Sequence, residues 1–103
     1  MVREPVALEV VLSELCQREA ELRARGIEHA AVFGSVARRE NHADSDIDIL
    51  VEVRRGMGFG TLGLMVLEEE LQAAFGRSVD VMSSDGLKLP KHAGIVRDLV
   101  RAF

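Results

Sequence analysis

The sequence predicts a mixed α/β (α+β) fold, in which a small mixed sheet of three strands is flanked by helices in the order α-β-(α)-β-α-β-α. Three observations predict it. The 103 residues suit a single domain spanning 1–103. Segments with helical periodicity alternate with short apolar runs along the chain. Glycine or polar residues stand where most of these segments end.

The first half of the chain holds a helix, a strand and a helical turn. Residues 4–25 predict a helix, because Gly26 follows as a stop and apolar residues share one side of it, at Leu8, Val11, Leu12, Leu15 and Leu22. Residues 29–33 form a short apolar run, which predicts a buried strand. A helical turn at residues 36–39 and a polar loop at residues 40–45 follow.

The second half of the chain contributes two more strands and two helices. Residues 46–53 alternate between apolar and polar side chains and predict a strand, with one face formed by Ile47, Ile49, Val51 and Val53. Residues 61–75 predict a helix that Gly76 ends. Residues 78–82 predict the third strand, and residues 93–103 predict a closing helix.

Composition excludes several classes of protein. The chain has 13 basic and 17 acidic residues, no Trp and no Tyr, which argues against direct binding of nucleic acid. No apolar stretch approaches the roughly 20 residues of a membrane span, so we expect no membrane partner. The single cysteine, Cys16, excludes an internal disulfide and fits a reducing compartment, so we expect a cytoplasmic protein.

Two carboxylates stand one residue apart, at Asp46 and Asp48. On a strand, such positions share a face about 6.5 Å apart, and their mutual repulsion makes ionising both costly. A divalent cation removes that cost, and Mg²⁺ favours one or two carboxylates completed by water and phosphate oxygens. The alternative is the solvated polar face of an edge strand, which the pair alone does not exclude.

Gly34 and Ser35 stand between a predicted strand and a helical turn. Glycine lets the backbone approach a ligand closely, and the following amides and the serine hydroxyl can hold phosphate oxygens at the start of a helix. By itself, however, the Gly-Ser pair is better explained as a turn with a helix cap.

Asp80 lies in the middle of the third predicted strand, between two valines that point to the opposite face. A carboxylate there is costly unless it is paired or functional. If this strand lies beside residues 46–53, three carboxylates meet at one end of the sheet, which would suit two metal ions and a phosphoryl chain. The alternative is a salt bridge with Arg77 or Arg97.

Together these residues resemble the signature of the nucleotidyltransferase superfamily. That signature has Gly-Ser, two acidic residues one apart and a third acid on another strand, here Gly34-Ser35-Val36-Ala37-Arg38, Ser45-Asp46-Ile47-Asp48 and Val79-Asp80-Val81. The resemblance covers roughly residue 8 to the end, and the length is similar to that of minimal nucleotidyltransferases. One departure is Arg39, where the family usually has glycine. A positive φ would strain the backbone at arginine.

The resemblance implies metal-binding roles for the three carboxylates. Asp46 and Asp48 would bind the Mg²⁺ that grips the β- and γ-phosphates of ATP. Both would share a second Mg²⁺ near the α-phosphate with Asp80, which would also help to deprotonate the attacking hydroxyl.

The resemblance also implies a phosphate-binding turn. Gly34 and Ser35 would hold the terminal phosphates of the leaving pyrophosphate. Arg38 or Arg39 would add positive charge there, although for either one a solvated arginine is the favoured interpretation.

Family members of this size often act as antitoxins that transfer AMP from ATP to a tyrosine of a partner HEPN-domain toxin, an RNase. The resemblance therefore implies a protein adenylyltransferase and antitoxin of a type VII-like pair. Because this chain has no tyrosine, it would modify tyrosine only in trans. Two alternatives are a binding antitoxin that acts by occlusion and a nucleotidyltransferase for RNA or an antibiotic. The three retained carboxylates favour an enzyme, and the small, acidic chain disfavours the other acceptors.

Overall fold

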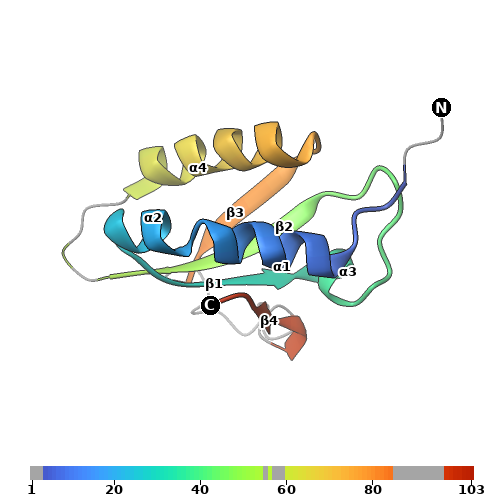
Figure 1. The fold of residues 1–103 in the computed structure, drawn as a ribbon, viewed down its shortest axis with the longest axis horizontal. Helices are drawn as coiled ribbons and strands as arrows, with labels where there is room; N and C mark the ends of the chain where they lie inside the picture. Colours follow the sequence, from blue (N-terminus) through green and yellow to red (C-terminus); the bar gives the residue numbers. More distant parts are fainter. Residues whose placement is uncertain (1–3, 55, 57–59, 85–96) are drawn as a thin grey trace.

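The computed structural model describes residues 4–54, 56, 60–84 and 97–103. Within them, one mixed sheet has the strand order β3-β2-β1-β4 (Figure 1). Its strands are β1 Ile27–Phe33, β2 Ile47–Val53, β3 Val79–Ser83 and β4 Val100–Arg101. β1 is antiparallel to β2 and β4, whereas β3 is parallel to β2. The predicted mixed sheet is confirmed, and the expected number of three strands is corrected to four.

Four helices accompany the sheet in the described residues: α1 Leu8–Gln17, α2 Glu19–Ala24, α3 Gly34–Ala37 and α4 Gly60–Phe75. α1, α2 and α4 lie over one side of the sheet (Figure 1). The single helix predicted over residues 4–25 is divided at Arg18, whose ψ of 4° departs from the helical value. None of the described helices has the length and apolar character that crossing a membrane requires.

The closing helix predicted over residues 93–103 is wrong in its second half. Residues 93–96 lie outside the described residues, Arg97 and Asp98 are helical, and the chain then extends as β4. Beyond β4, the Ala30 amide donates to Phe103 O at 3.2 Å, and the Ala102 amide donates to Ala30 O at 2.8 Å. The edge of β1 has backbone N–H and C=O groups that need hydrogen-bond partners. Pairing with these groups favours an extended C-terminal segment over the helix that its apolar periodicity predicts.

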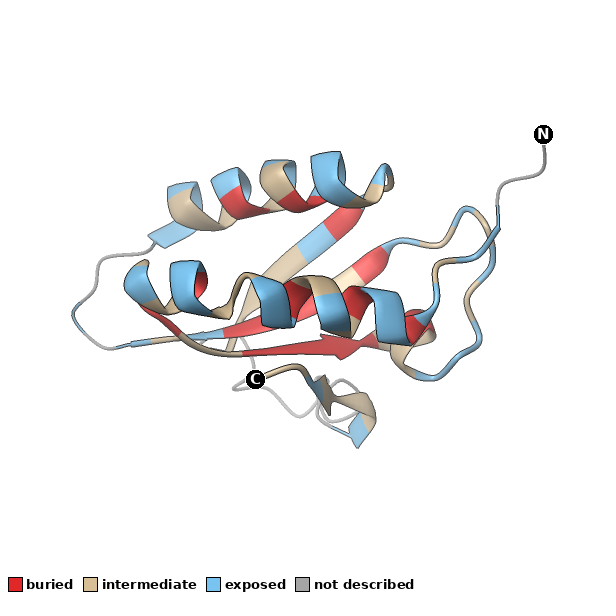
Figure 2. Ribbon diagram, in the orientation of Figure 1, coloured by how far each residue is buried: buried red, intermediate tan, exposed pale blue. Residues whose placement is uncertain are grey.

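The hydrophobic core lies between the helices and the face of the sheet that they cover (Figure 2). Helices and strands each contribute fully buried side chains, including Val11, Leu15, Leu22, Ile47, Ile49, Val51, Leu67, Leu71 and Val79. The alternation predicted for residues 46–53 is therefore confirmed. It turns Asp48, Leu50 and Glu52 to the face of the sheet opposite α1, α2 and α4.

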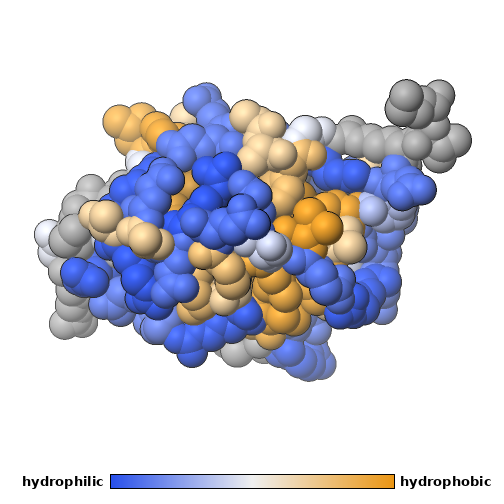
Figure 3. Space-filling view, viewed as in Figure 1, coloured by the Kyte–Doolittle hydropathy of each residue, from blue (hydrophilic) through white to orange (hydrophobic). Residues whose placement is uncertain are grey.

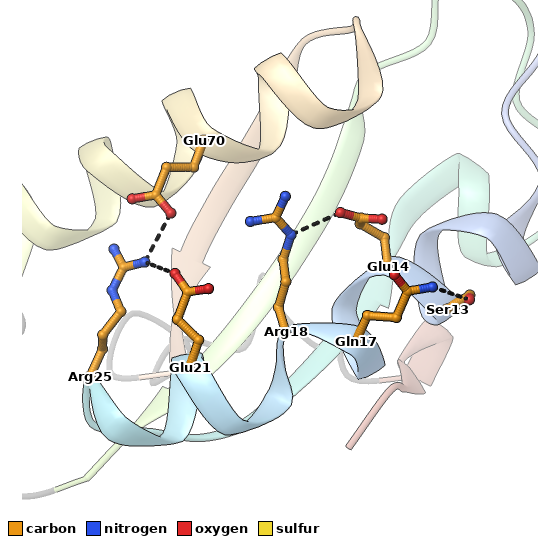
Figure 4. A network of polar contacts seen from close by, with 7 residues as sticks. All are labelled: Ser13, Glu14, Gln17, Arg18, Glu21, Arg25 and Glu70. Carbon is orange, nitrogen blue, oxygen red and sulfur yellow. Dashed lines mark hydrogen bonds and ion pairs between the residues drawn. The ribbon is translucent and has the colours of Figure 1, made fainter.

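Ion pairs connect the helices across their exposed surface (Figure 4). Arg25 Nη1 lies 2.9 Å from Glu70 Oε2 on α4 and 3.5 Å from Glu21 Oε1 on α2. Arg18 Nε lies 2.9 Å from Glu14 Oε1, one turn earlier. Ion pairs at a protein surface contribute about 0.2–1 kcal/mol each, and these pairs are only partly buried, so the core supplies most of the stability.

The helical side of the molecule is mostly hydrophilic, with one apolar patch near the start of α4 and further apolar areas toward the middle of the view (Figure 3). Exposed apolar side chains on α4 are Leu62, Met65 and Val66, whereas Leu67 and Leu71 face the sheet. α4 thus carries buried and exposed leucines on one helix, which allows a matched test of the core.

We predict that Leu71→Ala lowers the free energy of unfolding by about 2–5 kcal/mol, because it removes a fully buried side chain and leaves a cavity. Leu62→Ala, on the same helix but 74% exposed, should change it by less than about 0.5 kcal/mol. Urea unfolding followed by circular dichroism measures both values. Equal losses in the two variants would contradict the assignment of the core face of α4.

Candidate active site

Carboxylates from two adjacent strands meet at one end of the sheet. In the parallel register of β2 and β3, Asp48 is the partner of Asp80, and Asp46 immediately precedes β2. Asp48 is half-buried, whereas Asp46 and Asp80 are exposed. The expected neighbourhood of these three residues is thus present, and it results from the pairing of segments more than thirty residues apart in the sequence.

No ion pair within the described residues neutralises this carboxylate cluster, Asp46, Asp48 and Asp80. Arg77, one of the two partners considered for Asp80, instead donates through Nη1 to Ala43 O at 3.0 Å and through Nη2 to Glu4 O. Arg97, the other, is exposed and forms no ion pair with Asp80. The salt-bridge explanation of Asp80 therefore fails.

The crowding of negative charge changes the acidity of Asp48. Its pKa is raised from 3.8 to about 6, first by burial of the carboxyl group and then by the negative charges of Asp80 and Asp46. The positive charge of Arg38 opposes this rise. At neutral pH Asp48 is therefore ionised at a cost that a bound cation would remove.

Gly34 follows the last residue of β1 and touches the Asp48 carboxylate. Its φ is +74°, a conformation that favours glycine. A Cβ at this position would lie 2.3 Å from Asp48 Oδ2, closer than real side chains allow. Glycine is favoured at this position for two reasons: the positive φ of the turn and the nearby Asp48 carboxylate. The absence of a side chain lets Asp48 lie against the start of α3.

Ser35 is the second residue of the short helix α3, next to this contact. Its side chain is half-buried, and its hydroxyl forms no hydrogen bond in the part of the chain that the structure describes. The first amides of a helix have no acceptor within that helix. Ser35 and the neighbouring amides therefore bring donors close to the carboxylate cluster, as phosphate binding would require.

The two arginines after α3 have different surroundings. Arg38 Nη1 lies 2.9 Å from Asp98 Oδ2, and its Nε lies 3.0 Å from Glu40 Oε2. Arg38 is therefore held by two carboxylates instead of being simply solvated. Arg39 adopts the positive φ of 60° that the family's usual glycine would favour, and it pairs with Glu9.

Asp98 is a site neighbour that sequence reasoning missed. Asp98 is 60 positions from Arg38 in the sequence. The two side chains come into contact because β4, which follows Asp98, pairs with the edge of β1. No motif in the sequence marks this contact, since it depends on the path of the C-terminal segment.

The donor set fits a hard divalent cation completed by a substrate. Carboxylate oxygens are ligands that Mg²⁺ prefers, and the cluster holds a surplus of negative charge. Among the described residues, no group of three or more histidine, cysteine or acidic side chains is placed to hold a metal ion by itself. Phosphate oxygens and water would therefore complete the coordination, as is usual for Mg²⁺.

A mixed sheet with carboxylates on two neighbouring strands beside a Gly-Ser turn defines a domain for phosphoryl transfer from a nucleotide. The chain belongs to the nucleotidyltransferase domain family, whose sequence model matches residues 8–102. Domains of this family use ATP and a divalent metal ion.

One named relative is a protein adenylyltransferase, and a second is a candidate for the same activity. The chain is 37% identical to the protein adenylyltransferase MntA of Thermococcus cleftensis over 97 residues, which cover 93% of this chain and 92% of that protein. It is 44% identical over 62 residues to a candidate protein adenylyltransferase of Methanocaldococcus jannaschii, where the match covers 60% of this chain and 64% of the relative.

Solved structures share the fold. A candidate minimal nucleotidyltransferase superposes with a TM-score of 0.74 and 29% identity, covering 92% of this chain and 95% of that one. The complex of a tri-AMPylated Shewanella oneidensis HEPN toxin with its MNT antitoxin gives a TM-score of 0.62 at 17% identity, covering 89% and 71% of the two chains. At this lower identity the second likeness concerns the fold alone.

We predict that Gly34→Ala weakens Mg²⁺-ATP binding and lowers stability, because the new methyl group displaces Asp48 and the backbone is strained. Gly76→Ala is the matched control, since Gly76 has a φ of +66° but nothing within 4 Å of a Cβ. The control should lose about 1 kcal/mol from backbone strain alone and keep wild-type affinity. Thermal unfolding and calorimetric titration with Mg²⁺-AMP-PNP measure the two effects. Equal affinity in both variants would contradict the contact.

We predict that Asp48→Asn is more stable than wild type at pH 7.5 without metal, and that the difference disappears near pH 3.5. Between the unfolded value of 3.8 and the folded value of about 6, the folded state holds more protons at Asp48, so wild-type stability falls as pH rises through this window. Thermal unfolding in EDTA measures it, with the exposed Asp44→Asn as control. A difference independent of pH would refute the prediction.

Proposed function

We propose that this chain is a protein adenylyltransferase that transfers AMP from ATP to a tyrosine hydroxyl of a partner HEPN-type toxin, and so acts as the antitoxin of the pair. The observation that carries the proposal is a cluster of three carboxylates, none of them in an ion pair with a described residue, in a chain that matches an adenylyltransferase along almost its whole length. A cluster kept against its own repulsion suits catalysis better than occlusion.

In this proposal, the turn after β1 binds the leaving group. The amides that follow Gly34 and the Ser35 hydroxyl donate hydrogen bonds to the terminal phosphates. Gly34 makes this possible because its missing side chain leaves room for Asp48. Arg38, held by Asp98 and Glu40, keeps a positive charge near Asp48, where phosphate charge arrives.

The carboxylate cluster serves the reacting centre. Asp46 and Asp48 would hold one divalent ion, and Asp80 would join them in holding a second. When bound, these ions neutralise charge along the triphosphate. The tyrosine oxygen forms a bond to the α-phosphorus while the bond to the β-phosphate bridge breaks, and pyrophosphate leaves with the electron pair. Asp80 takes the hydroxyl proton. Positioning and charge neutralisation supply most of the rate.

A second candidate is an antitoxin that blocks its partner by occlusion without turnover. The same carboxylates count against it, because binding alone gives no reason to place three acidic side chains at one end of the sheet with no ion pair to any described residue. The two candidates differ in one measurable way, the mass of the partner toxin after contact with this chain and ATP.

We predict that the double variant Asp46→Asn, Asp48→Asn loses AMP transfer by roughly a thousandfold, since metal charge stabilisation is worth several kcal/mol. Asp44→Asn, two residues earlier and also exposed, should keep wild-type activity. The assay incubates the co-purified toxin with α-labelled ATP and Mg²⁺ and measures the intact mass of both chains. Neutralisation of the toxin by wild type with no gain in mass would establish occlusion instead.

A further inference from the structure

A groove lies on the face of the sheet opposite α1, α2 and α4. Its volume is about 320 Å³. Its lining has four apolar residues, Ala30, Ala31, Leu50 and Leu99, and four polar ones, His29, Glu52, Ser84 and Arg101. Ala31 and Leu50 are each only 8% exposed, so they belong to the sheet surface from which the groove is built.

The groove begins beside the carboxylate cluster, on the same strand. Asp48, Leu50 and Glu52 occupy alternate positions of β2 and therefore share one face, so the groove starts about 6.5 Å from Asp48. On β1, Leu50 pairs with Ala31, and Asp48 pairs with Phe33, the residue before Gly34. Along this face the Gly-Ser turn, the carboxylates and the groove thus follow one another in that order.

This order matters for a displacement at phosphorus. The attacking oxygen must enter opposite the leaving group, and holding it there in line supplies much of the rate. If the pyrophosphate leaves toward Gly34 and Ser35, the attacking oxygen must come from the other side of the carboxylates. That side holds the groove.

We infer that the groove seats the acceptor, an exposed tyrosine and its flanking backbone on the partner protein. This inference rests on the proposed function and assigns a place to its acceptor. The tyrosine oxygen would bond to the α-phosphorus as the bond to the pyrophosphate breaks, with the proton passing to Asp80 as described above.

The lining suits such an occupant. Leu50, Ala31 and Leu99 offer an apolar surface against which an aromatic ring can pack. At the far end, Arg101 Nη2 lies 2.9 Å from His29 Nε2, and His29 pairs across the strands with Glu52. These polar side chains offer donors and an acceptor to the backbone beside the tyrosine. Tyrosine also combines an apolar ring with a hydroxyl at its far end, which can reach from the groove toward the carboxylates.

Binding can be tested without catalysis. We would titrate the ¹⁵N-labelled protein with N-acetyltyrosinamide, N-acetylserinamide and AMP, and follow the amide signals of Ala31, Leu50 and Leu99. We expect saturable shifts with the tyrosine compound and much weaker ones with the serine compound. Saturable shifts with AMP that compete with the tyrosine compound would overturn the inference in favour of a nucleobase site. Absence of shifts with all three would also overturn it.

Enzyme kinetics then test the groove as the acceptor site separately from the proposed function. Ala31→Leu fills the groove, and Glu52→Arg reverses a charge at its exposed rim. Glu69→Arg makes the same charge change on the exposed side of α4 and is the control. We expect the first two variants to raise the KM for N-acetyltyrosinamide about tenfold and to leave the KM for ATP within about twofold, because only acceptor contacts are lost. The control should change neither value.

The outcomes are distinguishable. If both groove variants kept the wild-type KM for the acceptor, the groove would not be the acceptor site, and the proposed function would be unaffected. The wild-type protein could instead bind the tyrosine compound saturably in the groove but transfer AMP to no tyrosine. That result would refute the proposed function and support the groove as a binding site. Because Glu52 is exposed, Glu52→Arg keeps the test valid should Ala31→Leu fail to fold.

Discussion

Mutual repulsion among three carboxylates is the constraint around which this small molecule is arranged. Asp48 and Asp80 are partners across a parallel strand pair, and Asp46 is close enough to raise the pKa of Asp48. Such crowding opposes folding, so the rest of the chain must hold the strands in register. The core does so on the opposite face, where Ile47 and Ile49 alternate with the carboxylates and are fully buried.

The same constraint explains the turn after β1. Because the Asp48 carboxylate occupies the space where a side chain of residue 34 would lie, glycine is the residue that fits. Arg38 supplies a nearby positive charge, but Asp98 and Glu40 share it, which leaves the cluster with a surplus of negative charge. A divalent cation with a triphosphate is a ligand that matches both the surplus charge and the hydrogen-bond donors beside it.

Placing the helices on one side of the sheet leaves the other side for substrates. α1, α2 and α4 cover the core face (Figure 1). The opposite face, with Asp48 and Leu50, carries the cluster and the adjoining groove. The same 103 residues thus carry both the carboxylate cluster and a lined surface beside it. A partner that brings the acceptor would complete such a site.

The sequence by itself determined the mixed fold, the alternation of β2 and the residue types of the candidate site, because apolar periodicity and the Gly-Ser and Asp-x-Asp patterns are local. It also indicated that residue 39 departs from the family, and Arg39 does adopt a positive φ. Only the tertiary structure decided that β3 lies parallel to β2 with Asp80 opposite Asp48, that the C-terminal segment forms β4, and that Asp98 reaches Arg38. These features depend on pairing between distant segments, where unpaired backbone groups at a sheet edge outweigh local helical preference.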